Sequence, residues 1–307
     1  MNNRPGKWPR WEMTDPAITK GDVTIHGVLA QAALALESRS DTPRLDAEIL
    51  LSFVLGKPRS HLHAWPREHL DEGQYDTFRG LVQRRQDGEP VAYLTGRQAF
   101  WSLDYRVTPH TLIPRPETEH LVELALRLIP EEAAWRIADL GTGTGAIALA
   151  LAHERPRCQV VAVDVCARAL EVAAWNARHL GIGNVGFRQS DWFAGLRGER
   201  FDLIAANPPY VRHDDPHLAA LQYEPATALV SGPGGMEALE AIVSGARAHL
   251  TGAAWLVLEH GHDQGAATLD LLRRHGYHDV AGYRDYAGHD RNAVGRCPPQ
   301  EEESVIS

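Results

Sequence analysis

The chain has 307 residues, of which 44% are hydrophobic and 23% charged, and its formal net charge is -9. This length fits two domains better than one, and the composition is that of an ordinary globular protein. The negative charge disfavours nonspecific binding of nucleic acid, which usually needs a basic face. No apolar run is long enough to span a bilayer, and the polar residues 1–10 do not resemble a secretory signal.

The cysteines and histidines predict neither a disulfide framework nor a metal site. Cys158, Cys166 and Cys297 are an odd number without metal-type spacing, which favours a reducing, cytoplasmic location. The pairs His61-x-His63 and His260-x-His262 lack a set of partners in a ligand pattern. We therefore expect histidines at the surface or at strand edges, and no bound metal.

The N-terminal part predicts a flexible leader over residues 1–24 and a small helical domain over residues 25–97. Apolar residues in the second stretch recur with spacings of three and four, the period of an amphipathic helix. Asp41 and Thr42 stand where an N-cap belongs, and Pro43 suits a first helical turn. A second helical run ends in the turn signal Asp87-Gly88.

Residues 98–115 change character and predict a β-hairpin linker. Apolar residues stand near every second position from Phe100 to Val107, which is the period of a strand. Pro109-His110 separate this run from Leu112-Ile113 and mark the expected turn. A proline-containing loop then leads into a helix expected over residues 121–128.

The remainder of the chain predicts an α/β domain over residues 116–297. Short apolar runs alternate with longer amphipathic ones, which is typical of βαβ units and a mostly parallel sheet. We expect strands at 136–140, 159–164, 184–189, 201–206, 253–259 and 278–283. We expect helices at 145–154, 166–180, 235–249 and 263–275. Residues 298–307, with their prolines and glutamates, predict a disordered tail.

A glycine-rich loop follows the first strand of this domain, and it consists of Gly141, Thr142, Gly143, Thr144 and Gly145. Glycines allow a sharp turn and close approach of a ligand, and the helix behind them offers free N–H groups. Asp164 ends the next strand, where a carboxylate can bind both hydroxyls of a ribose. The loop fits S-adenosylmethionine, but Gly141, Gly143 and Ala146 also match the G-x-G-x-x-A pattern of NAD-binding proteins. Asp139, just before the glycines, suits a sulfonium or amino group better than a pyrophosphate.

The strand at 201–206 ends in Asn207, Pro208, Pro209 and Tyr210, at the sheet edge where α/β folds bind ligands. An amide or aromatic amine nitrogen is a poor nucleophile, so a site must hold its N–H groups and aim its lone pair. Asn207 and the Pro208 carbonyl supply acceptors, Pro209 fixes the direction of that carbonyl, and Tyr210 offers a flat face for stacking. Methyl transfer would then depend on orientation and electrostatics. This motif favours S-adenosylmethionine, because hydride transfer does not need it.

Three functions remain open from the residues. The first is methylation of a side-chain amide, and the second is methylation of an exocyclic amine of a nucleic acid base. The acidic charge and the lack of a basic stretch with interleaved aromatic residues argue against the second. The third is a module that only binds S-adenosylmethionine, and intact Asn207 and Tyr210 argue against it.

The chain from about residue 28 to residue 297 resembles the bacterial HemK/PrmC family, the glutamine methyltransferases that modify peptide chain release factors. The resemblance rests on these strings: PRLDAEILL (43–51), GEPVAYLTG (88–96), LIPRPETE (112–119), DLGTGTGAIALALA (139–152), SDWF (190–193), NPPY (207–210) and LEHGHDQG (258–265). One departure is the string from Gly234 to Leu239, where the family often has Asp-Gly-Leu at a helix start. It puts the start of that helix in doubt.

The resemblance implies a Rossmann-like, seven-stranded class I methyltransferase sheet with a helical substrate-binding domain in front. It implies that Gly141 to Gly145 and Asp164 contact S-adenosylmethionine together with Asn207, and that Trp192 flanks the adenine. Asn207 to Tyr210 would hold the glutamine of the Gly-Gly-Gln (GGQ) motif of release factors. We further expect a monomer that acts in the cytoplasm without a membrane and without binding nucleic acid directly.

Two pairs of residues have alternative interpretations. Glu117 and Glu119 would either approach the substrate or the sulfonium, or serve the first turn of the following helix, where acids are favoured. Phe100 and Trp101 would either line a substrate channel or pack within the hairpin. We favour the packing role for these two aromatic residues.

Overall fold

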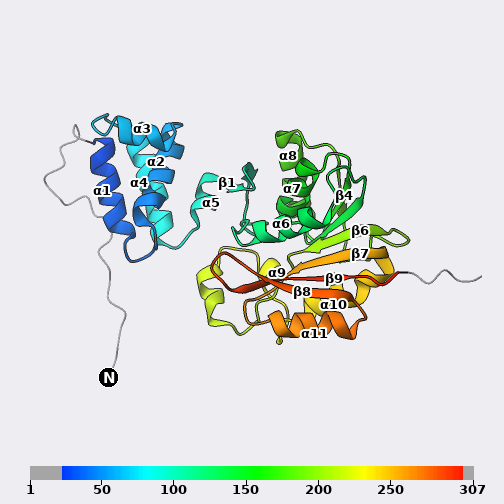
Figure 1. Cartoon of the computed structure of the whole chain (residues 1–307). Coiled ribbons are helices and arrows are strands. Elements are labelled where there is room, and N and C mark those ends of the chain that lie inside the picture. Colours follow the sequence, from blue (N-terminus) through cyan, green and yellow to red (C-terminus); the bar gives the residue numbers. More distant parts are fainter. Residues whose placement is uncertain (1–22, 300–307) are drawn as a thin grey trace, which may run out of the picture. The chain divides into compact units, whose positions relative to one another are not determined.

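The computed structural model describes residues 23–299, and the chain divides into two compact units after Gly96 (Figure 1). The flexible leader and the disordered tail expected from the sequence fall mainly on residues 1–22 and 300–307, which lie outside the described residues. None of the helices within residues 23–299 combines the length and the apolar character that crossing a bilayer requires.

The first unit is helical, as expected. Its helices are α1 (Ile25–Leu36), α2 (Pro43–Leu55), α3 (Arg59–Ala64), α4 (Glu72–Gln86) and α5 (Val91–Thr95). The apolar faces of α1, α2 and α4 meet in one core around Leu29, Leu50 and Phe78, which are fully buried. Asp71 caps α4 by accepting a hydrogen bond from the Gln74 N–H at 2.8 Å. This core belongs to the first unit and is separate from the two cores of the second.

The start of α2 lies at Pro43, where the sequence placed it, but the predicted cap is not formed. Thr42 occupies the N-cap position without a side-chain hydrogen bond to the helix backbone. Its hydroxyl instead lies 3.3 Å from a carboxylate oxygen of Asp46 in the first turn. Asp46 also accepts a hydrogen bond from Arg85 of α4 at 2.8 Å, so the helix start is connected to α4.

The second unit begins with a hairpin whose turn differs from the prediction. Strands β1 (Arg97–Phe100) and β2 (Leu103–Arg106) pair antiparallel, and the turn is at Trp101 and Ser102 rather than at Pro109-His110. Both turn residues have positive φ angles, 51° and 59°, which a two-residue hairpin turn requires. Neither is a residue type that favours this region. Glu119 holds the turn by accepting a hydrogen bond from the Trp101 N–H at 2.7 Å.

The core of the second unit is a seven-stranded sheet, which confirms the predicted fold class. Its strands are β3 (Arg136–Leu140), β4 (Gln159–Asp164), β5 (Val185–Gln189), β6 (Phe201–Ala206), β7 (Leu250–Glu259), β8 (His278–Arg284) and β9 (Asp290–Arg296). The spatial order is β5-β4-β3-β6-β7-β9-β8. The first five of these are parallel, and β9 runs antiparallel to both of its neighbours.

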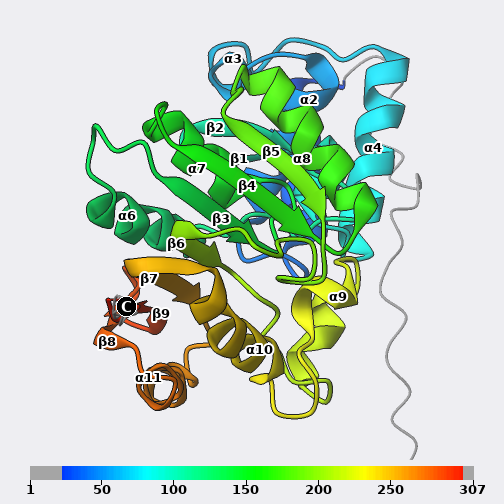
Figure 2. The same ribbon diagram turned by 90° about the vertical axis from the view of Figure 1, so that its right-hand side faces the viewer.

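Helices cover both faces of the sheet (Figure 2). One face carries α6 (Thr118–Leu128), α7 (Ala146–Glu154) and α8 (Ala167–Leu180), and the other carries α10 (Glu237–Ala246) and α11 (Gly265–Arg274). Short helices η1 (Pro216–Leu221), α9 (Ala226–Leu229) and η2 (Arg247–His249) lie in the connections. Since α7 is almost wholly apolar, it is buried from Ala146 to Ala152.

Several elements differ from the sequence prediction. Helix α6 and strand β7 begin three residues early, at Thr118 and Leu250. Helix α10 begins at Glu237 rather than at residue 235, because Gly232 and Gly235 have positive φ angles that a helix does not allow. The Glu237 carboxylate accepts a hydrogen bond from the Gly234 N–H at 2.8 Å and so closes this turn. The alternating pattern also missed β9, whose sequence DRNAVGR contains charged and polar residues within a buried strand.

Candidate functional site

The expected site residues follow neighbouring strands at one edge of the sheet. In the register, Leu140 of β3 stands opposite Ala206 of β6 and Val163 of β4. The residues that come next, Gly141, Asn207 and Asp164, therefore start from adjacent positions. The strand order reverses between β3 and β6, and ligands of open α/β sheets bind at this switch point.

The glycine loop is a tight turn that leads directly into α7. Gly141, Gly143 and Gly145 have φ angles of 75°, 54° and 84°, a region that other residues rarely adopt. A Cβ atom on Gly145 would meet Leu149 and Ala173 at 3.1 and 3.2 Å, so close packing also requires glycine there. The Thr144 carbonyl accepts a hydrogen bond from Asn176 of α8 at 2.9 Å, which fixes the loop from behind.

Asp139 lies beneath this loop and is fully buried. One carboxylate oxygen accepts hydrogen bonds from the Thr142 hydroxyl at 2.6 Å and from the Ala148 N–H at 3.2 Å. The other oxygen has no partner among the described residues. Burial raises the pKa of Asp139 to about 7, although the hydrogen bond from Thr142 acts against this shift. Its free oxygen suits a cationic group of a ligand.

Asp164 ends β4 and contacts the glycine loop directly. Its carboxylate oxygens accept hydrogen bonds from the Gly143 N–H and from the Cys166 N–H, each at 2.9 Å. Burial raises the pKa of this carboxyl against these hydrogen bonds. A carboxylate oxygen has more than one lone pair, so each oxygen retains the capacity to accept from a ribose hydroxyl.

Trp192 follows β5 and lies near the start of the glycine loop. A Cβ atom on Gly141 would lie 3.6 Å from its ring. The residue has a φ angle of 43°, and its carbonyl accepts a hydrogen bond from the Ser190 hydroxyl at 2.8 Å. The structure thus brings Trp192 together with the glycine loop. An aromatic ring there has a flat face that suits an adenine.

The segment from Asn207 to Tyr210 is held by groups to which the sequence assigned no role. The Asn207 side-chain nitrogen donates a hydrogen bond to the Thr118 hydroxyl at 3.1 Å. The Tyr210 hydroxyl lies 3.3 Å from a carboxylate oxygen of Glu259, the last residue of β7. Thr118 and Glu259 belong to the strings LIPRPETE and LEHGHDQG, and this was the only sequence signal for them.

The backbone of the same segment is fixed from the start of α11. The Gln264 side-chain nitrogen donates hydrogen bonds to the carbonyls of Tyr210 and Gly235, both at 3.0 Å. A Cβ atom on Gly235 would lie 2.9 Å from the Tyr210 carbonyl oxygen. Only glycine therefore fits at position 235 without moving the segment that ends at Tyr210.

The loop before α6 is fastened to the chain that follows the Asn207–Tyr210 segment. The buried Glu224 accepts hydrogen bonds from the Ile113 N–H at 3.1 Å and from the Arg115 guanidinium. This ion pair links the loop that precedes Thr118 to the loop that follows Tyr210. The sequence did not point to Glu224.

Phe100 and Glu119, each from a pair with two possible roles, make contacts within the second unit. Phe100 is buried in the core and packs edge-on against Tyr105, as the packing interpretation expected. Glu119 lies in the first turn of α6, and its carboxylate binds the hairpin turn, a contact that neither interpretation expected. Glu117 takes the N-cap position of α6 without a capping hydrogen bond.

The histidine pairs bind protein groups. His61 lies 2.8 Å from Glu68, and the buried His260 donates from Nδ1 to the Gly261 carbonyl at 2.8 Å. His260 directly follows β7, so it is a strand-edge residue but not a surface one. Within residues 23–299, no group of three or more His, Cys, Asp or Glu side chains is arranged to hold a metal ion.

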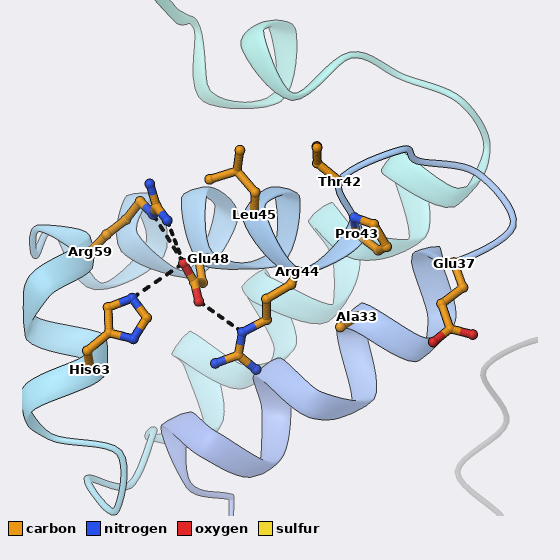
Figure 3. Close-up of a pocket in the computed structure, with 9 residues that line it drawn as sticks. All are labelled: Ala33, Glu37, Thr42, Pro43, Arg44, Leu45, Glu48, Arg59 and His63. Carbon is orange, nitrogen blue, oxygen red and sulfur yellow. Dashed lines mark hydrogen bonds and ion pairs between the residues drawn. The ribbon is translucent and has the colours of Figure 1, made fainter.

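A pocket of about 540 Å³ lies in the first unit and contains none of the predicted site residues (Figure 3). Its polar centre is Glu48, whose carboxylate accepts hydrogen bonds from Arg44 at 2.9 Å and Arg59 at 2.8 Å and lies 3.5 Å from His63. Burial would raise the pKa of Glu48, but these hydrogen bonds outweigh it and lower the pKa. The carboxylate is satisfied within the protein, and it cross-links α2 and α3.

Comparison with family models supports both parts of the chain. The model of the PrmC N-terminal domain matches residues 27–96, and that of the methyltransferase small domain matches residues 119–230. The second range includes the glycine loop, Asp164, Trp192 and the segment from Asn207 to Tyr210.

Curated relatives match over most of their length. The chain is 51% identical over 262 residues to the release factor glutamine methyltransferase of Salmonella typhimurium, which covers 85% of this chain and 94% of the relative. It is 49% identical over 268 residues to the release factor glutamine methyltransferase of Xylella fastidiosa, with 87% and 98% covered. Among solved structures, a methyltransferase from Pyrococcus furiosus is similar in fold, with a TM-score of 0.50, 18% identity, and 71% of this chain and 97% of that chain covered.

Proposed function

The chain belongs to the release factor glutamine methyltransferase family, and we propose that it transfers a methyl group to the side-chain amide nitrogen of a glutamine in a peptide chain release factor. The observation that carries this proposal is the 51% identity that extends over 94% of a relative of that name. The glutamine is that of the Gly-Gly-Gln motif, which the sequence resemblance implies.

The glycine loop and its neighbours suit S-adenosylmethionine, which supplies a methyl group bound to a positively charged sulfur. The unpartnered, fully buried oxygen of Asp139 supports this choice, because a cation stabilises the ionised carboxylate. We propose that Asp164 binds the ribose hydroxyls and that Trp192 flanks the adenine. The remaining contacts are assigned to Gly141, Thr142, Gly143, Thr144, Gly145 and Asn207.

The segment from Asn207 to Tyr210 suits a planar amide. The Asn207 side-chain nitrogen donates a hydrogen bond to Thr118, so the Asn207 side-chain oxygen is left to accept a hydrogen bond from an N–H of the substrate. Pro208 offers its backbone carbonyl for the second N–H, and Pro209 restricts the direction of that carbonyl. Both acceptors orient the nitrogen lone pair, and Tyr210 stacks on the amide plane. The proton that the nitrogen loses after methylation passes to water.

We also propose roles for the parts of the chain. Residues 25–97 bind the release factor, residues 98–115 link the domains, and residues 116–297 carry out the chemistry. The match of residues 27–96 to an N-terminal domain model of this family supports the first role. We propose a monomer that acts in the cytoplasm, which agrees with three free cysteines.

The test is transfer of radiolabelled methyl from S-adenosylmethionine to a purified bacterial release factor. A matched release factor carries alanine in place of the glutamine of its Gly-Gly-Gln motif, and DNA and RNA are assayed in parallel. Label on the first factor and not on the second supports the enzyme, the substrate and the atom together. Label on nucleic acid alone would replace the proposal with methylation of an exocyclic base amine.

A further inference from the structure

Three elements of the second unit bring polar side chains together around Asn207 and Tyr210. The Asn207 nitrogen donates to the Thr118 hydroxyl at 3.1 Å, and Thr118 is the first residue of α6. The Thr118 hydroxyl in turn lowers the pKa of Glu259, which indicates that it lies beside that carboxyl group at the end of β7. Glu259 also receives the Tyr210 hydroxyl at 3.3 Å. The two ends of the segment Asn207–Tyr210 are therefore joined through one buried carboxyl group.

The ionisation of Glu259 determines the direction of these hydrogen bonds. An ionised carboxylate accepts hydrogen bonds and donates none. The Thr118 hydroxyl has a single proton, and when it donates this proton to Glu259, its oxygen is left to accept from Asn207. Asn207 must then turn its nitrogen toward Thr118 and its carbonyl oxygen away. A protonated Glu259 can itself donate to Thr118, and this constraint is lost.

We propose that Thr118 and Glu259 are positioning residues that hold the Asn207 side-chain amide with its carbonyl oxygen directed to the substrate amide. This inference rests on the proposed function, because it assigns the free end of Asn207 to the substrate glutamine. An amide turned the other way would present N–H groups to the substrate N–H groups. The substrate nitrogen would then lose an acceptor that orients its lone pair.

Burial makes this arrangement sensitive to pH. Glu259 and Thr118 are 1% and 4% exposed, and the second Glu259 oxygen has no partner among the described residues. Burial raises the pKa of Glu259 to about 7, helped by the charge of Glu117 and opposed by Thr118 and Arg291. The neighbouring His260 is buried as well, which lowers its pKa, so it adds no charge at neutral pH. We therefore expect Asn207 to be held in one orientation above this pKa and to be released as the pH falls through it.

The experiment compares T118V with T118S, since valine has the shape of threonine without the hydroxyl and serine keeps the hydroxyl. Methyl transfer to the release factor is measured as kcat and KM, and the Kd for S-adenosylmethionine is measured separately. T118V is expected to lower kcat at least tenfold, with KM and Kd changed less than threefold, and T118S is expected to restore most of the turnover. Wild-type turnover in T118V, or equal loss in T118S, would overturn the proposal.

A second variant, E259Q, tests the direction of the hydrogen bonds between pH 5.5 and 8.5. Wild-type kcat is expected to fall about tenfold per pH unit below 7. E259Q is expected to have a lower kcat at pH 8 and no such fall, because glutamine does not titrate. An unchanged acid limb in E259Q would overturn the role of Glu259. Failure of the wild-type enzyme to label the release factor at any pH would instead refute the proposed function.

Discussion

Replacement of Asp139 by asparagine tests whether its free oxygen faces the cationic part of S-adenosylmethionine. The pKa of Asp139 is raised to about 7, so on the order of one tenth of the carboxyl groups are ionised at pH 6 and nine tenths at pH 8. A cation favours the ionised form, so binding tightens as the pH rises through 7. The association constant should therefore fall about tenfold from pH 8 to pH 6, which is about 1.4 kcal/mol.

Titration calorimetry of S-adenosylmethionine between pH 5.5 and 8.5 measures this effect in both proteins. Asp139→Asn should bind about 1–3 kcal/mol more weakly at pH 8, the scale of a lost charge-assisted hydrogen bond, and without the tenfold fall. Asp164 and the groups of the ligand titrate in both proteins, so the difference between the two curves belongs to Asp139. Parallel curves would refute the assignment of Asp139 to the cation, and thermal unfolding controls for the fold of the variant.

Other changes test the remaining parts of the structure. Asn207→Ala should lower turnover by orders of magnitude in a single-turnover assay and weaken binding of S-adenosylmethionine far less, because Asn207 is only one of several contacts assigned to that ligand; full turnover would exclude Asn207 from the chemistry. Gly235→Ala places a Cβ atom 2.9 Å from the Tyr210 carbonyl oxygen and should reduce turnover about tenfold. Gly183→Ala, with nothing within 4 Å, is the matched control and should leave turnover unchanged. Glu48→Gln should destabilise the first unit by roughly 1–3 kcal/mol, seen as faster proteolysis. The pKa of Glu48 is lowered in the folded state, so the ionised carboxylate stabilises the wild-type first unit. This stabilisation should be lost as the pH falls through the lowered pKa. A rate of proteolysis that does not change with pH would contradict the role of Glu48.

Much of the second unit was predictable because its central strands β3, β4 and β6 are short, apolar and largely buried. The expected ranges 136–140, 159–164 and 201–206 coincide with β3, β4 and β6. The residues that follow these strands meet at one edge because the strands are parallel neighbours. The placement of the glycine loop, Asp164 and Asn207 thus depends on local pattern and on a general property of parallel sheets.

The parts that were not predictable depend on contacts between distant residues. The hairpin turn at Trp101 and Ser102 lacks the glycine or asparagine that favours positive φ, and it is fixed by Glu119, 18 positions away from Trp101. The hydrogen bond between Asn207 and Thr118 joins residues 89 positions apart. Glu259 looked like any acid at a strand end, and its unusual pKa comes from burial. A periodic pattern contains no information on such contacts.

The position of β9 has a consequence for the order in which the sheet is assembled. Strand β8 pairs only with β9 in the sheet, and β9 separates it from β7. Asn292 of β9 stands opposite Glu259 in the register, and both residues are almost fully buried. A nascent chain that has reached β8 therefore has a glycine loop and the segment Asn207–Tyr210 but an open edge at β7. Synthesis of residues 290–296 completes the sheet and supplies the strand that pairs with Glu259, so loss of this strand should inactivate the enzyme while leaving the glycine loop intact.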